Sequence, residues 1–160
     1  MSYFQRFNYV NYNSVQLTDI LKRVKIRERI KTDAELFVTY FIKEGETPEM
    51  VATRAYDNPE QFWVILMANN ITNPYGEWPV TSTTLIDIVG KKYGVDNIHA
   101  THHFEDKDGV TVNSDAVGAV SVSNFDFEDR QNESLREIRI IIPDLVPILQ
   151  QELNELVRED

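Results

Sequence analysis

Cysteine is absent from all 160 residues of the chain. This absence excludes disulfide bonds, thiol nucleophiles and cysteine-ligated zinc, and it fits assembly in a reducing cytoplasm. The chain also has no apolar run of the roughly 18–20 residues that a membrane-spanning helix needs, so we expect no transmembrane helix. The first residues lack the charged start, apolar middle and small-residue cleavage site of a secretory signal, so the sequence gives no indication of export.

Positive charge is scarce, because 16 Lys and Arg residues face 26 Asp and Glu residues, for a formal net charge of −10. An acidic surface repels phosphate backbones, so we do not expect nucleic acid as a partner. The exception is a basic strand predicted at residues 22–31. In an extended conformation four of its charged side chains share one face, namely Arg23, Lys25, Arg27 and Arg29. That face is either the solvated side of a half-buried strand or a docking surface for an acidic protein.

The sequence motifs of common catalytic sites are missing as well. There is no Gly-x-Ser-x-Gly, no phosphate-binding loop and no His-Glu-x-x-His. The three histidines are His99, His102 and His103, and two of them could bind a metal from one face of a strand with Glu105 or Asp106. Exposed polar residues of a hairpin are more commonly just solvated, so we expect no catalysis, no metal and no cofactor.

Aromatic side chains are concentrated in the first 20 residues, which show neither a helical nor a strand period. They are Tyr3, Phe4, Phe7, Tyr9 and Tyr12. Aromatic residues supply much of the binding energy at protein interfaces, so this N-terminal arm is a candidate contact surface for a neighbouring protein. The alternative, an arm that folds back on its own core, remains equally open.

A strand and a helix are predicted in the next part of the chain. Residues 36–42 are rich in β-branched and aromatic side chains, which favours a strand. Thr47 is then a suitable N-cap, and Pro48 suits the first position of a helix ending near Tyr56.

A second helix is predicted from Pro59 to about Asn69, with Asn58 as its N-cap. Its body, residues 62–68, is apolar around the whole circumference and must therefore be covered on all sides. A module of fewer than about 60 residues has too little mass to cover such a helix on every side. We expect other polypeptide to cover the helix, either flanking segments of the same chain or another subunit. The predicted contact residues here and in the following turn are Phe62, Trp63, Leu66, Met67, Tyr75 and Trp78.

The remainder of the chain is expected to form a third helix, a β-hairpin, a loop, a strand and an amphipathic helix. These elements fall at about residues 82–93, 98–112, 113–124, 135–142 and 145–156.

Two stretches of the sequence resemble parts of a known module. Residues 40–52 resemble the first half of a LysM module, with a Lys-x-Gly-Glu-Thr turn at residues 43–47, and residues 69–74 resemble its Asn-x-Ile-x-Asn-Pro ending. The resemblance implies an α+β fold: a LysM-like βααβ core with an extended N-terminal arm, a basic strand, a β-hairpin and a C-terminal strand plus amphipathic helix. The corresponding domain boundaries are 1–35, 36–94, 95–124 and 125–160.

The wider arrangement resembles the baseplate wedge proteins of contractile-tailed bacteriophages. The matching segments are residues 58–66, 73–79, 91–94 and 132–141. This resemblance implies a structural subunit of the virion that clamps neighbouring wedge proteins together in a hexameric tail baseplate, assembled in the host cytoplasm. The implied partners are other baseplate wedge proteins, with neither nucleic acid nor a membrane.

The alternative function is that of a glycan-binding module. Many LysM modules bind N-acetylglucosamine chains in a shallow groove, which here would fall between residues 45–47 and 71–74. Such binders are typically small exported modules, whereas this one is embedded in a larger chain without a signal. Glycan binding is therefore the less favoured interpretation, because a fold alone does not establish a function.

Overall fold

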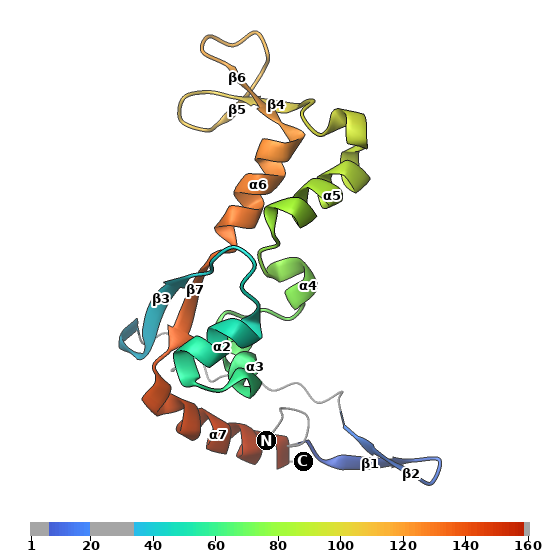
Figure 1. Cartoon of the computed structure of the whole chain (residues 1–160), viewed down its shortest axis with the longest axis vertical. Helices are drawn as coiled ribbons and strands as arrows, with labels where there is room; N and C mark the ends of the chain where they lie inside the picture. The colour runs from blue at the N-terminus through green and yellow to red at the C-terminus, as the bar shows by residue number, and fades with distance from the viewer. Residues whose placement is uncertain (1–6, 20–33, 159–160) are drawn as a thin grey trace. The chain divides into compact units, whose positions relative to one another are not determined.

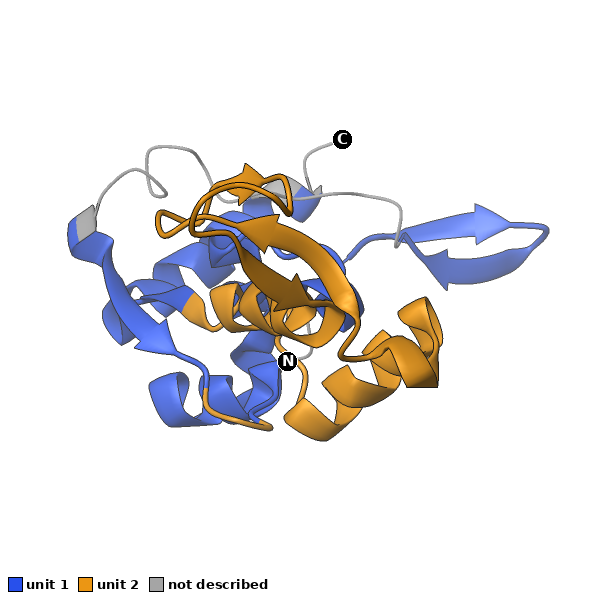
Figure 2. Cartoon of the chain, turned by 90° about the horizontal axis from the view of Figure 1, so that it is seen from above, with its two compact units in different colours: residues 1–42, 46–77, 138–160 blue, residues 43–45, 78–137 orange. Residues whose placement is uncertain are grey.

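The computed structural model describes residues 7–19 and 34–158, which form an α+β fold divided into two compact units (Figure 2). Unit 1 comprises residues 1–42, 46–77 and 138–160, and unit 2 comprises residues 43–45 and 78–137. The predicted domain boundaries at residues 94 and 124 both fall inside unit 2. The predicted contact residues outside the described part are Tyr3, Phe4, Arg23, Lys25, Arg27 and Arg29.

Unit 1 contains a two-stranded sheet whose strands are far apart in the sequence. Strand β3 (Phe37–Phe41), which follows a short 3-10 helix (Ala34–Leu36), pairs with β7 (Glu137–Ile141) (Figure 1). Both strands were predicted, and both are confirmed. Their pairing was not predictable from local patterns, because almost all of unit 2 lies between them in the chain.

The helix that follows β3 is α2 (Pro48–Tyr56), and it begins where the sequence predicts. The Thr47 hydroxyl accepts a hydrogen bond from the backbone N–H of Met50 at 3.4 Å. This bond satisfies one of the N–H groups that have no partner within the first turn. The helix ends at Asp57, which has a left-handed conformation with a φ of 55°.

The second predicted helix is also confirmed, with a 3-10 first turn (Pro59–Gln61) that continues into α3 (Phe62–Ala68). The Asn58 side chain caps it by accepting a hydrogen bond from the Glu60 N–H at 2.9 Å. At the other end, the Asn69 side chain donates to the Ile65 carbonyl at 2.9 Å. A single-turn helix, α4 (Pro74–Glu77), completes this part of unit 1.

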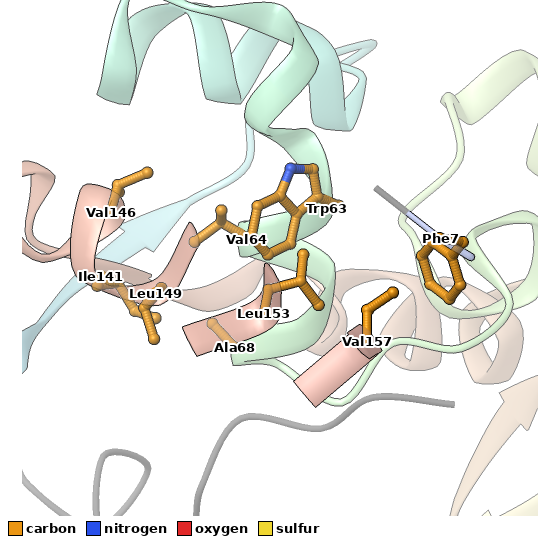
Figure 3. Close-up of a cluster of buried hydrophobic side chains, with 9 residues drawn as sticks. All are labelled: Phe7, Trp63, Val64, Ala68, Ile141, Val146, Leu149, Leu153 and Val157. Atoms are coloured by element: carbon orange, nitrogen blue, oxygen red, sulfur yellow. The ribbon is translucent and has the colours of Figure 1, made fainter. Parts of the chain in front are cut away.

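Much of the apolar circumference of α3 is covered by the chain itself, since Trp63, Val64, Ile65 and Ala68 are buried. Helix α7 (Val146–Arg158), preceded by a 3-10 turn (Pro143–Leu145), contributes four side chains to the same buried cluster as three residues of α3 (Figure 3). The cluster consists of Phe7, Trp63, Val64, Ala68, Ile141, Val146, Leu149, Leu153 and Val157. Of the two possibilities left open by the sequence, the flanking segment is the one observed. Trp63 is only 4% exposed, which corrects its prediction as a contact residue for another protein.

The N-terminal segment forms a β-hairpin, which corrects the expectation of an arm without strand structure. Strand β1 (Tyr9–Tyr12) pairs antiparallel with β2 (Val15–Thr18), and Tyr12 lies opposite Val15. The turn residues Asn13 and Ser14 have φ values of 48° and 64°, the positive pair that a type I′ turn requires. The strand period was hidden because apolar side chains occur on both faces of the hairpin.

Unit 2 combines two helices with a three-stranded antiparallel sheet. Helix α5 (Ser82–Tyr93) confirms the third predicted helix. Thr81 is its N-cap, and a 3-10 turn (Val95–Asn97) follows it. In the sheet, β4 (Thr101–Glu105) lies between β5 (Thr111–Val112) and β6 (Val120–Ser123). The hairpin of β4 and β5 was predicted.

Two elements of unit 2 differ from the sequence predictions. Strand β6 lies within residues 113–124, where a loop was expected from the small and polar residues around it. Its own residues alternate between valine and serine, and the strand pairs with β4. Helix α6 (Asn124–Ser134) follows directly and was not predicted. Its signal is a capping box in which Ser123 and Asp126 bond each other's backbone N–H groups.

Across residues 7–19 and 34–158, the structure contains no helix with the length and apolar character needed to cross a membrane.

Candidate interaction surfaces

The β1–β2 hairpin presents an unusually apolar surface for an exposed element. We call it the hairpin surface, and its exposed side chains are Tyr9, Val10, Tyr12, Val15 and Leu17. Tyr9 is 64% exposed and Tyr12 is 66% exposed, and residues 9–18 carry no charge. A two-stranded hairpin is marginally stable by itself in water, so a surface of this kind gains from contact with another protein.

The base of the hairpin is fixed to unit 1. Phe7 is 4% exposed and belongs to the buried cluster. The Asn8 side chain donates to the Val157 carbonyl of α7 at 3.3 Å, and the Asn8 carbonyl accepts from the Asp19 N–H at 2.8 Å. The two hypotheses for the aromatic arm therefore apply to different residues. Phe7 packs into the core of the same chain, whereas Tyr9 and Tyr12 remain exposed and can contact a neighbouring protein.

The other predicted contact residues in the described part differ in accessibility. Tyr75, in α4, is 95% exposed and available for contact. Trp78 is only 7% exposed, which corrects its prediction as an accessible contact residue. Phe62, Leu66 and Met67 are half-buried, and Met67 packs against the core cluster of unit 1.

The turn before α2 has a structural role in this chain. The Glu46 carboxylate is 9% exposed and receives a hydrogen bond from the Tyr40 hydroxyl at 2.8 Å and an ion pair from Arg54 at 2.6 Å. Burial and the neighbouring Glu46 carboxylate raise the pKa of the Tyr40 hydroxyl above its usual value. With Thr47 engaged as the N-cap, the turn residues Glu46 and Thr47 hold β3 and α2 together.

A cavity of about 260 Å³ opens in unit 1 between the sheet and α2. Its lining residues are Val38, Tyr40, Val51, Arg54, Ala55, Ile140, Ile141 and Pro143. Residues 45–47 and 71–74, where a glycan groove was expected, contribute nothing to this lining. The cavity thus gives the glycan-binding alternative no support.

The histidines are arranged differently from the metal site considered above. His103 lies 2.9 Å from Glu105 and 2.8 Å from His102, whereas the His99 ring contacts Phe125 with a centroid distance of 5.9 Å. Within residues 7–19 and 34–158, no three His, Asp or Glu side chains are placed to hold a metal ion. The His102–His103 contact does not follow from the sequence pattern, since adjacent strand residues normally point to opposite faces.

Comparison with known proteins places the chain in a family. The family model for base plate wedge protein 53 matches residues 1–113, which include the hairpin, β3, α2 and α3. The chain belongs to the base plate wedge protein 53 family. Among curated proteins it is similar to baseplate wedge protein gp53 of Enterobacteria phage T4, with 30% identity over 83 residues.

The similarity to this wedge protein is partial. The aligned segment covers 52% of this chain but only 42% of the T4 protein, so the chain matches less than half the length of that relative. The family match also ends before β6, α6, β7 and α7. The elements that complete the sheet and the buried cluster of unit 1 therefore lie beyond the matched residues of the family model.

Proposed function

We propose that this chain is a non-catalytic structural subunit of a phage tail baseplate wedge, where it joins neighbouring wedge proteins in a hexameric assembly. Membership of the wedge protein family supports the setting, which is the virion after assembly in the host cytoplasm. The observation that carries the joining role is the hairpin surface, with large uncharged side chains exposed on an element that is anchored in the core.

The chemistry of the hairpin surface favours a protein partner. Burial of a large apolar side chain contributes about 1.5–3 kcal/mol, and tyrosines are frequent hot spots of interfaces. The absence of charge in residues 9–18 means that docking requires no charged group to lose its water. Phe7 and Asn8 fix the hairpin base before binding, which reduces the entropy lost on association.

The order of elements in unit 1 supports a LysM-like core. Strand β3, helices α2 and α3, and the pairing of β7 with β3 would give a βααβ arrangement with most of unit 2 inserted before the last strand. In this proposal the core is a scaffold that presents the contact residues and binds no glycan. The further proposed contact residues are Tyr3, Phe4, Arg23, Lys25, Arg27, Arg29, Phe62, Leu66, Met67 and Tyr75.

Co-expression with the other baseplate wedge proteins of the same phage, followed by size-exclusion chromatography, tests the proposal. We expect the wild type to elute in a complex, and the double variant Tyr9→Ser/Tyr12→Ser to bind at least about tenfold more weakly, since two hot-spot side chains are removed. The matched control is Val117→Ser, which changes a fully exposed apolar residue of unit 2 and should leave binding unchanged.

The two parts of the proposal fail in distinguishable ways. A wild-type chain that elutes alone in every combination contradicts the joining role. A double variant that remains in the complex with wild-type affinity shows that the hairpin surface is not the contact, while the wedge function stands. Circular dichroism of the double variant should match the wild type, because both tyrosines are exposed.

A further inference from the structure

Backbone groups of the β1–β2 hairpin point outward along both of its edges. In an antiparallel hairpin, pairs that exchange two backbone hydrogen bonds alternate with pairs that exchange none. Because Tyr12 and Val15 flank a two-residue turn, they form a bonded pair. The next pair, Asn11 and Gln16, is therefore a non-bonded one, and its N–H and C=O groups point away from the opposite strand.

The same alternation continues to the base of the hairpin. Tyr9 and Thr18 form the second non-bonded pair. The hydrogen bond from the Asp19 N–H to the Asn8 carbonyl, at 2.8 Å, marks the bonded pair that follows them. The outward groups of β1 thus belong to Tyr9 and Asn11. In the part of the chain that the structure describes, these outward groups have no hydrogen-bond partner.

The alternation of pairs also separates the side chains of the hairpin into two faces. The bonded pairs place their side chains on one face, which we call the apolar face and which consists of Val10, Tyr12, Val15 and Leu17. Each of these side chains is at least 44% exposed. Two strands alone give such a face little stability, whereas a sheet of three strands with an apolar face can be stable.

The hairpin lacks the features that commonly keep an edge strand from pairing with another protein. Such features include charges, prolines, bulges, very short strands and a covering group. Residues 9–18 contain no charge and no proline, and their four pairs follow without a register shift. By contrast, β5 has only two residues, and the Asn69 side chain bonds both backbone groups of Arg139 in β7. The hairpin edges are therefore open to another strand.

Strand β1 begins directly after the residues that attach the hairpin to unit 1. Phe7 is buried in the cluster that covers α3, and the Asn8 side chain donates to the Val157 carbonyl at 3.3 Å. A strand that is already held in place loses less entropy when another strand pairs with it. This favours the edge of β1 over the edge of β2.

We propose that the outer edge of β1 binds an extended strand of a neighbouring wedge protein, so that the hairpin becomes a three-stranded sheet. This inference rests on the joining role proposed above and specifies the form of the contact. The added strand bonds the outward N–H and C=O groups of Tyr9 and Asn11. It is uncharged, since the hairpin offers no charged group, and apolar side chains at every second position continue the apolar face.

Two proline variants at directly opposed residues, Asn11→Pro and Gln16→Pro, test which edge is used. Each removes one outward N–H and leaves the apolar face and the bonds between β1 and β2 in place. Calorimetric titration measures their affinity for the wedge protein that binds the wild type in the co-expression experiment. We expect Asn11→Pro to bind at least about tenfold more weakly than the wild type. Gln16→Pro, and Asn11→Ala, which keeps the N–H, should bind like the wild type.

The outcomes separate this inference from the joining role. If the wild type binds but the two proline variants bind equally, or Gln16→Pro binds more weakly, the inference is wrong while the joining role stands. A wild type that binds no wedge protein contradicts the joining role and the inference with it. Sedimentation of the isolated chain should show a monomer. A dimer that Asn11→Pro abolishes would identify a second copy as the occupant and overturn the choice of partner.

Hydrogen exchange of the wild-type chain, free and in the complex, needs no variant to fold. With single amides resolved by NMR, we expect those of Tyr9 and Asn11 to exchange at least about tenfold more slowly in the complex. The amides of Gln16 and Thr18 face the other edge and should keep their exchange rates. Unchanged exchange at Tyr9 and Asn11, or equal protection of both edges, overturns the inference.

Discussion

Replacing Leu153 with alanine is expected to lower the free energy of unfolding of unit 1 by about 2–5 kcal/mol. Leu153 is 3% exposed in α7 and belongs to the buried cluster that covers α3. The truncation removes apolar contacts and leaves a cavity beside Trp63 and Val64, because a close-packed cluster relaxes only partly. Urea unfolding followed by circular dichroism gives the magnitude, and hydrogen exchange of α3 peptides locates the loss.

The matched control is Ile148→Ala in the same helix, where the side chain is 59% exposed. We expect this change to stay within about 0.5 kcal/mol of the wild type. If Leu153→Ala were equally mild, α7 would not be what covers α3, and the original possibility of another subunit on that surface would return. Faster exchange in α3 for the Leu153 variant alone supports the chain's own helix as the cover.

Much of the local structure of this chain was predictable because its signals lie close together in the sequence. Thr47 with Pro48, and Asn58 with Pro59, mark helix starts through caps that the structure contains. Helix α6 has an equally local signal in Ser123 and Asp126, which was missed because its body is too polar to show an apolar period. A search for capping boxes alone would have found it.

The long-range structure could not be predicted in the same way. Nothing local indicates that β3 pairs with β7, or that residues 78–137 form most of a separate unit between them. The candidate contact residues show the same limit. An aromatic side chain is equally suited to a core and to an interface, so Trp63 and Tyr9 were predicted alike, although one is buried and the other is exposed.

Asparagine side chains make two of the long-range connections within the units. In unit 1, the Asn69 amide donates to the Arg139 carbonyl and accepts from the Arg139 N–H, each at 2.8 Å. In unit 2, Asn132 of α6 accepts from the Val80 N–H at 2.8 Å and donates to the Val80 carbonyl at 3.1 Å. Each side-chain amide bonds both the N–H and the C=O of one distant residue, as the backbone of a neighbouring strand would.

Replacing Asn132 with alanine is therefore expected to destabilise unit 2 by about 2 kcal/mol, because Val80 keeps two backbone groups without their partner. Asn132 is 7% exposed, so water reaches the vacated site poorly. The control is Gln131→Ala, which removes an exposed amide from the same helix and should change stability by less than about 0.5 kcal/mol. Urea unfolding compares the two variants.

Hydrogen exchange distinguishes the loss of this connection from a general weakening of α6. The Val80 amide should exchange faster in Asn132→Ala than in the wild type, whereas its protection in Gln131→Ala should be unchanged. An unchanged exchange rate of the Val80 amide in Asn132→Ala would mean that another group replaces the Asn132 side chain without loss of stability. The connection matters because Val80 lies two residues before the start of α5, so the Asn132 side chain joins the start of α5 to α6.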